Sequence, residues 1–152
     1  MTTLTEGAKA PDIQAKDHEG NPVKLSDYKG RKVILFFYPK ANTPGCTAEA
    51  CNLRDNYKEL SEKGFKIIGV SADDEKKQKN FAEKFNFPYP LIPDTDKKVI
   101  NDYGVWGPKK FMGKTYDGIH RTTFVISEEG NIEKIFTQVK TKEHAEQILN
   151  EY

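Results

Sequence analysis

The sequence predicts an α/β fold in which helices cover both sides of a mixed β-sheet. Residues 32–38 form an unbroken apolar, β-prone run, which is typical of a strand buried on both faces of a parallel sheet. Helical apolar spacing follows this run twice, over residues 43–63 and 73–85, with a second strand at residues 65–71 between the two helices. This alternation predicts parallel strands joined by helices.

The other predicted elements are shorter and depend on turn residues, prolines and apolar spacing. In chain order they are a hairpin, an extended piece, a short helix, a second hairpin and a closing helix, over residues 11–27, 88–93, 96–103, 122–139 and 141–152. The first hairpin is an N-terminal extension of the core. Because no linker, repeat or low-complexity tract interrupts the 152 residues, we expect one domain spanning residues 1–152.

Charge and hydropathy exclude several classes of partner. The 24 basic and 23 acidic residues are interleaved, which argues against a nucleic acid or a membrane surface as partner. The longest apolar run, residues 33–38, is too short to span a bilayer, and the first residues lack the basic start and apolar stretch of a signal peptide. We therefore expect a cytoplasmic protein, in which two cysteines are more often catalytic or metal-binding than structural.

The two cysteines lie in the most informative segment of the chain, Pro39-Lys-Ala-Asn-Thr43-Pro44-Gly45-Cys46-Thr-Ala-Glu49-Ala-Cys51. A predicted strand leads into this segment, and Cys46 lies in the first turn of the helix that follows. The free N–H groups and the dipole of a helix start favour an anion there. The arrangement indicates a thiolate, and hence a thiol-dependent redox enzyme.

The helix start alone does not supply enough energy for a stable thiolate. An ordinary thiol is only a few per cent ionised at pH 7, and making it mostly thiolate needs about 3.4 kcal/mol. The helix dipole typically contributes about 0.3–1 kcal/mol. Further groups must therefore help, and the candidates are the Thr43 hydroxyl and Arg121, a cation at the entry to a core strand.

The spacing of Cys46 and Cys51 has a mechanical consequence. In an ideal helix, residues five apart are separated by about 7.5 Å along the axis and about 140° around it. Their Cα atoms would lie about 8–9 Å apart, beyond the reach of a disulfide. A bond between them requires the first turns of the helix to unwind, and Asn42, Pro44 and Gly45 make this segment easy to remodel.

The string Pro39-x-x-x-Thr43-x-x-Cys46 resembles the active-site signature of the peroxiredoxins. With Glu49 and Cys51 added, it resembles the peroxiredoxin Q group, also called bacterioferritin comigratory protein. The resemblance covers essentially the whole chain, through the further segments 25–30, 33–38, 105–107 and 118–126.

This resemblance implies a thioredoxin-like fold and a thiol peroxidase that needs no metal or organic cofactor. In that family pattern Cys46 matches the peroxidatic cysteine and Cys51 the resolving cysteine. The supporting residues that it implies are Thr43 and Arg121, which bind and polarise the peroxide, Pro39, Pro44 and Gly45, which shape the pocket, and Glu49, which orients the arginine.

The implied reaction reduces hydrogen peroxide or an organic hydroperoxide to water or an alcohol. Cys46 becomes a sulfenic acid, Cys51 condenses with it after local unwinding, and thioredoxin or a similar dithiol reduces the resulting disulfide. By the same analogy we expect a monomer.

Two other functions remain open. A thiol–disulfide oxidoreductase is disfavoured because its Cys-x-x-Cys spacing is absent and Thr43 would have no role. A non-enzymatic peroxide sensor would use the same cysteine chemistry and the same unwinding, so the sequence does not fully separate it from a peroxidase. A zinc site is not expected, because about four suitably spaced ligands are needed.

We assign no function to the three histidines or to the apolar residues Trp106, Phe111 and Met112. His18 is expected in a turn, His120 on the strand face opposite Arg121, and His144 in an exposed first turn. Trp106 and its neighbours Phe111 and Met112 are expected to pack into the core, with an apolar rim beside the site as the alternative.

Overall fold

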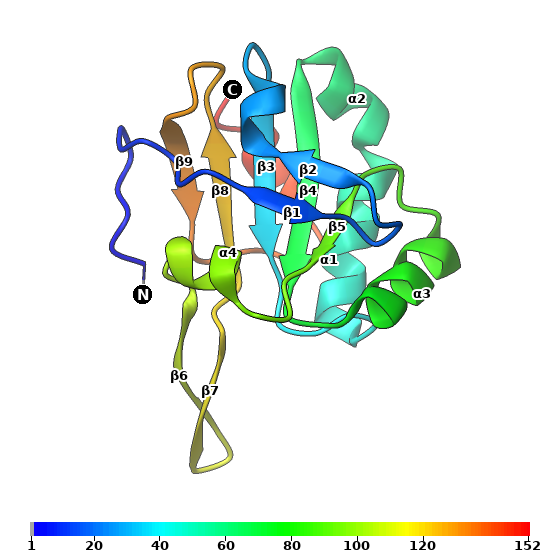
Figure 1. Ribbon diagram of the computed structural model, residues 1–152, viewed down its shortest axis with the longest axis vertical. Helices are drawn as coiled ribbons and strands as arrows, with labels where there is room; N and C mark the ends of the chain where they lie inside the picture. The colour runs from blue at the N-terminus through cyan, green and yellow to red at the C-terminus, as the bar shows by residue number, and fades with distance from the viewer. Residues whose placement is uncertain (1) are drawn as a thin grey trace.

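The computed structural model describes residues 2–152 and contains a five-stranded mixed sheet. The strand order is β5-β4-β3-β8-β9, as Figure 1 shows. The first three strands are parallel and the last two are antiparallel to their neighbours. Their bounds are β3 Lys32–Phe37, β4 Phe65–Ser71, β5 Leu91–Pro93, β8 Thr122–Ile126 and β9 Ile132–Phe136.

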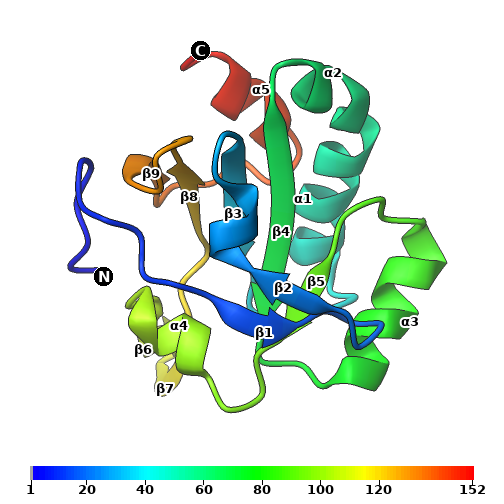
Figure 2. The same cartoon turned by 45° about the horizontal axis from the view of Figure 1, so that its top comes forward.

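The predicted α/β architecture is confirmed, with a covering layer on each face of the sheet (Figures 1 and 2). One face packs against four helices, α1 Pro44–Asp55, α2 Tyr57–Glu62, α3 Glu75–Phe85 and α5 His144–Leu149. The other face is covered by the hairpin β1 Gln14–Lys16 with β2 Pro22–Lys24, the 3-10 helix η1 Leu25–Tyr28, and α4 Lys98–Asp102. The N-terminal hairpin therefore extends the core as expected.

Strand β3 lies at the centre and explains why its sequence is apolar throughout. Alternate side chains of a strand point to opposite faces, and Leu35 and Phe37 enter one hydrophobic cluster while Ile34 and Phe36 enter the other. Both faces are covered, so no polar alternation is needed.

The register of the sheet decides where the functional residues meet. Phe37 at the end of β3 pairs with Thr122 at the start of β8. Because these two strands are antiparallel, the chain leaving β3 and the chain entering β8 lie at the same edge of the sheet. The N-terminus of α1, which follows β3, and Arg121, which precedes β8, therefore both lie at this edge.

The single helix predicted over residues 43–63 is wrong, because Asn56 divides it into α1 and α2. The Asn56 side-chain amide donates to the Asn52 carbonyl at 2.9 Å. The Asn52 carbonyl also accepts from the Asn56 backbone N–H at 3.2 Å, and the helix is interrupted only locally, where the Asn56 backbone departs to φ −103° and ψ 12°. The stop at Gly64 is as expected, with a positive φ of 89°.

The sequence did not predict a further antiparallel hairpin, which is formed by β6 Trp106–Phe111 and β7 Lys114–Ile119. Figure 1 shows it projecting from the body of the molecule. Met112 and Gly113 both have positive φ at its tip, as a tight hairpin turn requires. Core packing is therefore wrong for Phe111 and Met112, which are 66% and 87% exposed, whereas Trp106 is partly buried against the core. Lysines interrupt its apolar alternation, which left no clear strand signal.

Within residues 2–152 no helix is both long enough and apolar enough to cross a membrane.

Candidate active site

Cys46 is the third residue of α1, directly after the turn that leaves β3. Thr43 is the N-cap residue and Pro44 occupies the first helical position, where the missing N–H of proline costs nothing. The Cys46 side chain is 1% exposed and packs with the helical face of the core. The sulfur is therefore shielded, and it lies where free backbone N–H groups favour an anion.

Arg121 lies directly before β8, and its side chain reaches the sulfur of Cys46. Its Nη2 donates to Cys46 Sγ at 3.3 Å, and its Nη1 donates to Glu49 Oε1 at 2.6 Å. Burial works against the charge of Arg121, but the neighbouring Glu49 and Cys46 outweigh it and raise the arginine pKa above its ordinary value. The structure thus brings together three of the residues that the sequence singled out.

Glu49 lies one turn after Cys46 and is completely buried. Burial raises the pKa of Glu49 from its ordinary 4.5 to about 7, although Arg121 opposes the shift. Its Oε1 accepts from Arg121, but among the described residues its Oε2 has no hydrogen-bond partner. A buried carboxyl with one free oxygen is costly as an anion and favours the protonated form.

Gly45 is required for the close approach of Arg121. A Cβ atom at this position would lie 3.2 Å from Arg121 Nη2, tighter than ordinary van der Waals contact. The glycine therefore leaves the space through which the guanidinium reaches Cys46.

Thr43 and the two prolines frame the site without bonding to the sulfur. The Thr43 hydroxyl donates to the Lys40 carbonyl at 2.8 Å. Pro39 is half-buried directly after Tyr38, and Pro44 is exposed at the helix start. The hydroxyl of Thr43 must turn from Lys40 if it is to contact a substrate.

Cys51 lies on the same continuous helix α1 and is half-buried. Both cysteines are free thiols. Burial raises the pKa of Cys51, while the nearby Arg54 opposes the rise. The two cysteines are five positions apart on this helix, so the helix must open before their sulfurs can bond.

His144 was expected in an exposed first turn, and this is wrong, because its side chain is fully buried. The start of α5 is held against α1 by Asn52, whose Oδ1 accepts from the Ala145 N–H at 2.6 Å. His144 Nε2 consequently lies 3.7 Å from Glu49 Oε2. The one available signal was that His144 shares a helix face with the apolar Ile148.

Lys109 was also missed and is a second cation of this region. Its Nζ donates to the Ile119 carbonyl at 2.9 Å, which folds the side chain back along the β6–β7 hairpin. Burial and the charge of Arg121 lower the pKa of Lys109, whereas Cys46 raises it. The lysine thus adds positive charge near the sulfur without bonding to it.

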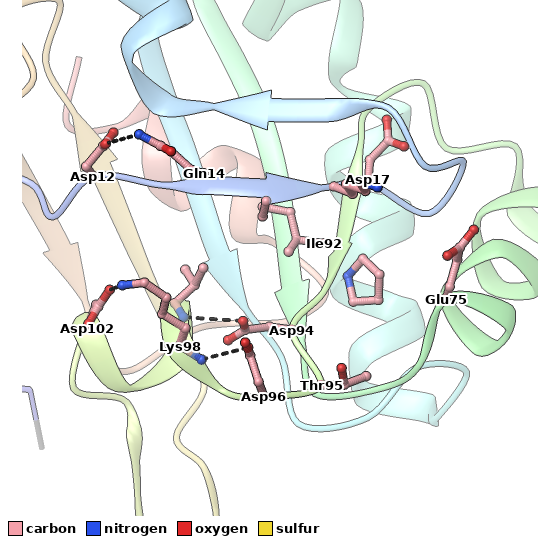
Figure 3. Close-up of a pocket in the computed structure, with 14 residues that line it drawn as sticks. Asp12, Gln14, Asp17, Glu75, Ile92, Asp94, Thr95, Asp96, Lys98 and Asp102 are labelled. Atoms are coloured by element: carbon pink, nitrogen blue, oxygen red, sulfur yellow. Dashed lines mark hydrogen bonds and ion pairs between the residues drawn. The ribbon is translucent and has the colours of Figure 1, made fainter.

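An acidic cleft lies between β1 and α4, away from Cys46, and is drawn in Figure 3. Its Asp94 accepts from the backbone N–H groups of Val99 and Ile100 at 3.3 and 2.8 Å, so this carboxylate fixes the start of α4. Within the part of the chain that is described, no three His, Cys, Asp or Glu residues are arranged to hold a metal ion. The cleft is therefore explained by local structure, and the chemistry concentrates at Cys46.

Comparison with protein families gives a match to the AhpC/TSA family over residues 7–135. The chain is 47% identical to peroxiredoxin Bcp of Escherichia coli over 150 residues, which cover 99% of this chain and 96% of that protein. It is 46% identical to peroxiredoxin Bcp of Bacillus subtilis over 147 residues, covering 97% and 94% respectively.

Solved structures give the same result. A mutant of Xanthomonas campestris peroxiredoxin Q superposes with a TM-score of 0.88 and 33% identity, covering 99% of this chain and 96% of that one. A Xanthomonas campestris bacterioferritin comigratory protein, solved for insight into its alkyl peroxide reduction activity, also gives 0.88 at 32% identity, with the same coverage. The fold of these neighbours and the mixed sheet of this chain agree over almost their full lengths.

Proposed function

Because the chain belongs to the AhpC/TSA family, among its Bcp or peroxiredoxin Q members, we propose that it reduces hydroperoxides with Cys46 as the attacking thiolate and Cys51 as the resolving thiol. The protein is a thiol peroxidase by this membership, and its two cysteines fit the atypical two-cysteine type. The proposal concerns which residues perform each step.

In the first step the Cys46 thiolate attacks one peroxide oxygen. An S–O bond forms, the O–O bond breaks, and the departing alkoxide or hydroxide takes a proton to leave as an alcohol or water. Cys46 is oxidised to a sulfenic acid while the peroxide is reduced. Arg121 faces both the thiolate and the developing negative charge on the departing oxygen, so it stabilises the transition state more than the ground state.

The observation that carries this proposal is the contact of Arg121 Nη2 with Cys46 Sγ at 3.3 Å, braced by Glu49 at 2.6 Å. A charge-assisted bond in a water-poor site is stronger than its equivalent in solvent. Thr43 completes the proposed site if its hydroxyl turns from Lys40 towards a bound peroxide. Gly45 leaves room for Arg121, and Pro39 and Pro44 complete the proposed pocket on either side of Thr43.

In the second step Cys51 attacks the Cys46 sulfenic acid, an S–S bond forms and hydroxide leaves as water. This step requires α1 to unwind from its N-terminus, because both cysteines lie on one continuous helix. Asn42, with a positive φ of 63°, already departs from regular backbone just before this helix.

An external dithiol then restores the enzyme, and thioredoxin is the reductant that we propose. The two free thiols need a reducing compartment to be regenerated, which supports a cytoplasmic location. We further propose a monomer and one domain over residues 1–152, in keeping with the two hydrophobic clusters that share the single central sheet.

The test is peroxide-dependent NADPH oxidation in an assay coupled through thioredoxin and thioredoxin reductase. Wild type should turn over, and Cys46→Ser should abolish peroxide consumption. Cys51→Ser should consume one equivalent of peroxide and then fail to cycle with thioredoxin. Residual turnover of Cys46→Ser near the wild-type rate rejects the nucleophile, and normal cycling of Cys51→Ser rejects the resolver. Clean oxidation of wild-type Cys46 without turnover indicates another reductant or a sensor.

A further inference from the structure

The buried oxygen Glu49 Oε2 has no use in the reaction described so far. It lies 3.7 Å from His144 Nε2, and both side chains are fully buried. The other carboxylate oxygen, Oε1, binds Arg121. Glu49 therefore connects the arginine of the site to a histidine on α5.

The hydrogen bonds of Gln147 fix the protonation of the His144 ring. Gln147 Nε2 donates to the Gln138 carbonyl at 2.9 Å, and Gln147 Oε1 accepts from the Lys140 N–H at 3.2 Å. This orientation leaves Oε1 as the acceptor facing His144 Nδ1 at 3.0 Å, so Nδ1 carries a hydrogen. In the neutral ring Nε2 is then an acceptor.

The neutral state of His144 follows from its surroundings. Burial, helped by the charge of Arg121, lowers the pKa of His144 from 6.5 to about 4, although Gln147 and Glu146 oppose the shift. Nε2 accepts a hydrogen bond from the Thr123 hydroxyl at 2.8 Å and lies 3.7 Å from Glu49 Oε2, beyond hydrogen-bonding distance and with no N–H to donate to that oxygen. A lone pair at this position disfavours negative charge on Oε2 and favours a proton there.

A proton on Oε2 changes the charge of the site without changing its geometry. Glu49 Oε1 still accepts from Arg121 as a carbonyl oxygen, so the guanidinium stays in place. The positive charge of Arg121 is then no longer balanced by Glu49 and is available to Cys46 and the peroxide. An ionised Glu49 would instead compete with the thiolate for the same cation.

We propose that His144 is a positioning residue of the peroxidase site, whose neutral ring with an unprotonated Nε2 keeps a proton on Glu49, so that the charge of Arg121 is directed to Cys46. The inference rests on the proposed function. His144 acts through Glu49 and Arg121 and does not touch the reacting atoms.

Other titratable groups approach this pair from each element packed around it. They are Cys46 on α1, Arg121 before β8, Glu146 on α5, Tyr89 before β5, and Lys109 on β6, which faces Arg121. Strand β9 contributes the apolar Phe136, whose ring lies edge-on to His144 at 5.8 Å. Of these groups Arg121 bonds directly to Glu49, so the pair responds chiefly to its charge.

The test measures the second-order rate constant for oxidation of Cys46 by hydrogen peroxide in single turnovers, followed by the fluorescence of Trp106, the single tryptophan. Glu49→Gln imitates the protonated carboxyl at every pH. Its rate constant relative to wild type should rise by about threefold or more between pH 6 and pH 8, as wild-type Glu49 ionises. A ratio that stays flat or falls overturns the proposal. Glu133→Gln is the matched control, since it removes a carboxyl paired with Lys32 at the far end of β3, and its ratio should stay flat.

The role of His144 itself is tested by repeating the comparison in two further variants. His144→Phe removes the Nε2 lone pair, and Gln147→Glu favours a charged His144, so in both Glu49 should ionise more readily. When Glu49→Gln is added to either variant, its rate constant relative to that parent variant should begin to rise at a pH lower by about half a unit or more than in the wild-type comparison. Gln147 is only half-buried, so its variant keeps the test available if His144→Phe does not fold. If the ratio of rate constants rises at the same pH as in the wild-type comparison, or at a higher pH, the proposed role of His144 is rejected.

The Cys46→Ser blank separates the two hypotheses. Peroxide consumption by Cys46→Ser removes the proposed function, whatever the Glu49 variants do. An inactive Cys46→Ser together with an unchanged ratio removes only the role of the Glu49–His144 pair.

Discussion

From the Glu49–His144 pair we predict how the free energy of unfolding depends on pH, a property that can be measured without peroxide. In the folded protein the pKa of Glu49 is raised from 4.5 to about 7, chiefly by burial. The pKa of His144 is lowered from 6.5 to about 4, also chiefly by burial. Between about pH 4.5 and pH 6.5 the folded pair therefore holds one proton on the carboxyl, and the unfolded pair holds one proton on the imidazole.

The two pKa shifts change the free energy of unfolding in opposite directions as pH rises. A raised carboxyl pKa makes the folded state retain a proton that the unfolded state has lost, so the free energy of unfolding falls as pH rises from 4.5 towards 7. A lowered histidine pKa makes the folded state release a proton that the unfolded state keeps, so the free energy of unfolding rises from pH 4 to 6.5. In wild type the two effects cancel.

Single substitutions should remove the cancellation. In His144→Phe the carboxyl acts alone, and the free energy of unfolding should fall by up to about 2.5 kcal/mol, relative to wild type, from pH 4.5 to pH 6.5. In Glu49→Gln the histidine acts alone, and the same quantity should rise by a similar amount, about 2.5 kcal/mol. The double substitution should again be flat.

The assay is urea unfolding of the four proteins at several pH values between 4.5 and 6.5, with each variant referred to wild type at the same pH. This reference cancels the titration of every other group. If the pKa values of these two groups were the same in the folded and unfolded protein, each substitution would change the stability by the same amount at all pH values. Parallel curves for the two single variants would refute the reasoning.

Two further predictions concern the site and its opening. Gly45→Ala should slow oxidation of Cys46 by about tenfold or more in stopped-flow measurements, because its methyl group would lie 3.2 Å from Arg121 Nη2 and displace it; a wild-type rate shows that Arg121 has room to move. Oxidation to the disulfide should increase amide hydrogen exchange across residues 43–54, because α1 must unwind for Cys51 to reach Cys46; unchanged exchange in this range contradicts the opening step.

Local signals in the sequence determined a large part of this protein. The apolar run of β3 and the helical spacing after it predicted parallel strands and helices, because burial on both faces leaves a continuous apolar pattern. Cys46 at a helix start, with Cys51 five residues later, predicted both the thiol chemistry and the need for unwinding. Turn residues also predicted the stop at Gly64.

The sequence did not predict the elements whose apolar pattern is absent or ambiguous. The β6–β7 hairpin projects from the body, so its side chains carry no buried-face pattern to detect. The break at Asn56 is a local change of backbone angles that keeps the hydrogen bond from the Asn56 N–H to the Asn52 carbonyl, so the apolar spacing of the sequence suits an unbroken helix equally well.

Tertiary structure alone assembled the charge network of the site. Glu49 and His144 are 95 positions apart, and only the packing of α5 on α1 buries both and leaves 3.7 Å between them. The pairing of β3 with β8 likewise brings Arg121 to Cys46. Burial shifts pKa values because it removes water from around a charge, and burial is a property of the packed fold. The sequence identified the candidate groups for the chemistry, and the fold shifts the pKa values that set their charges.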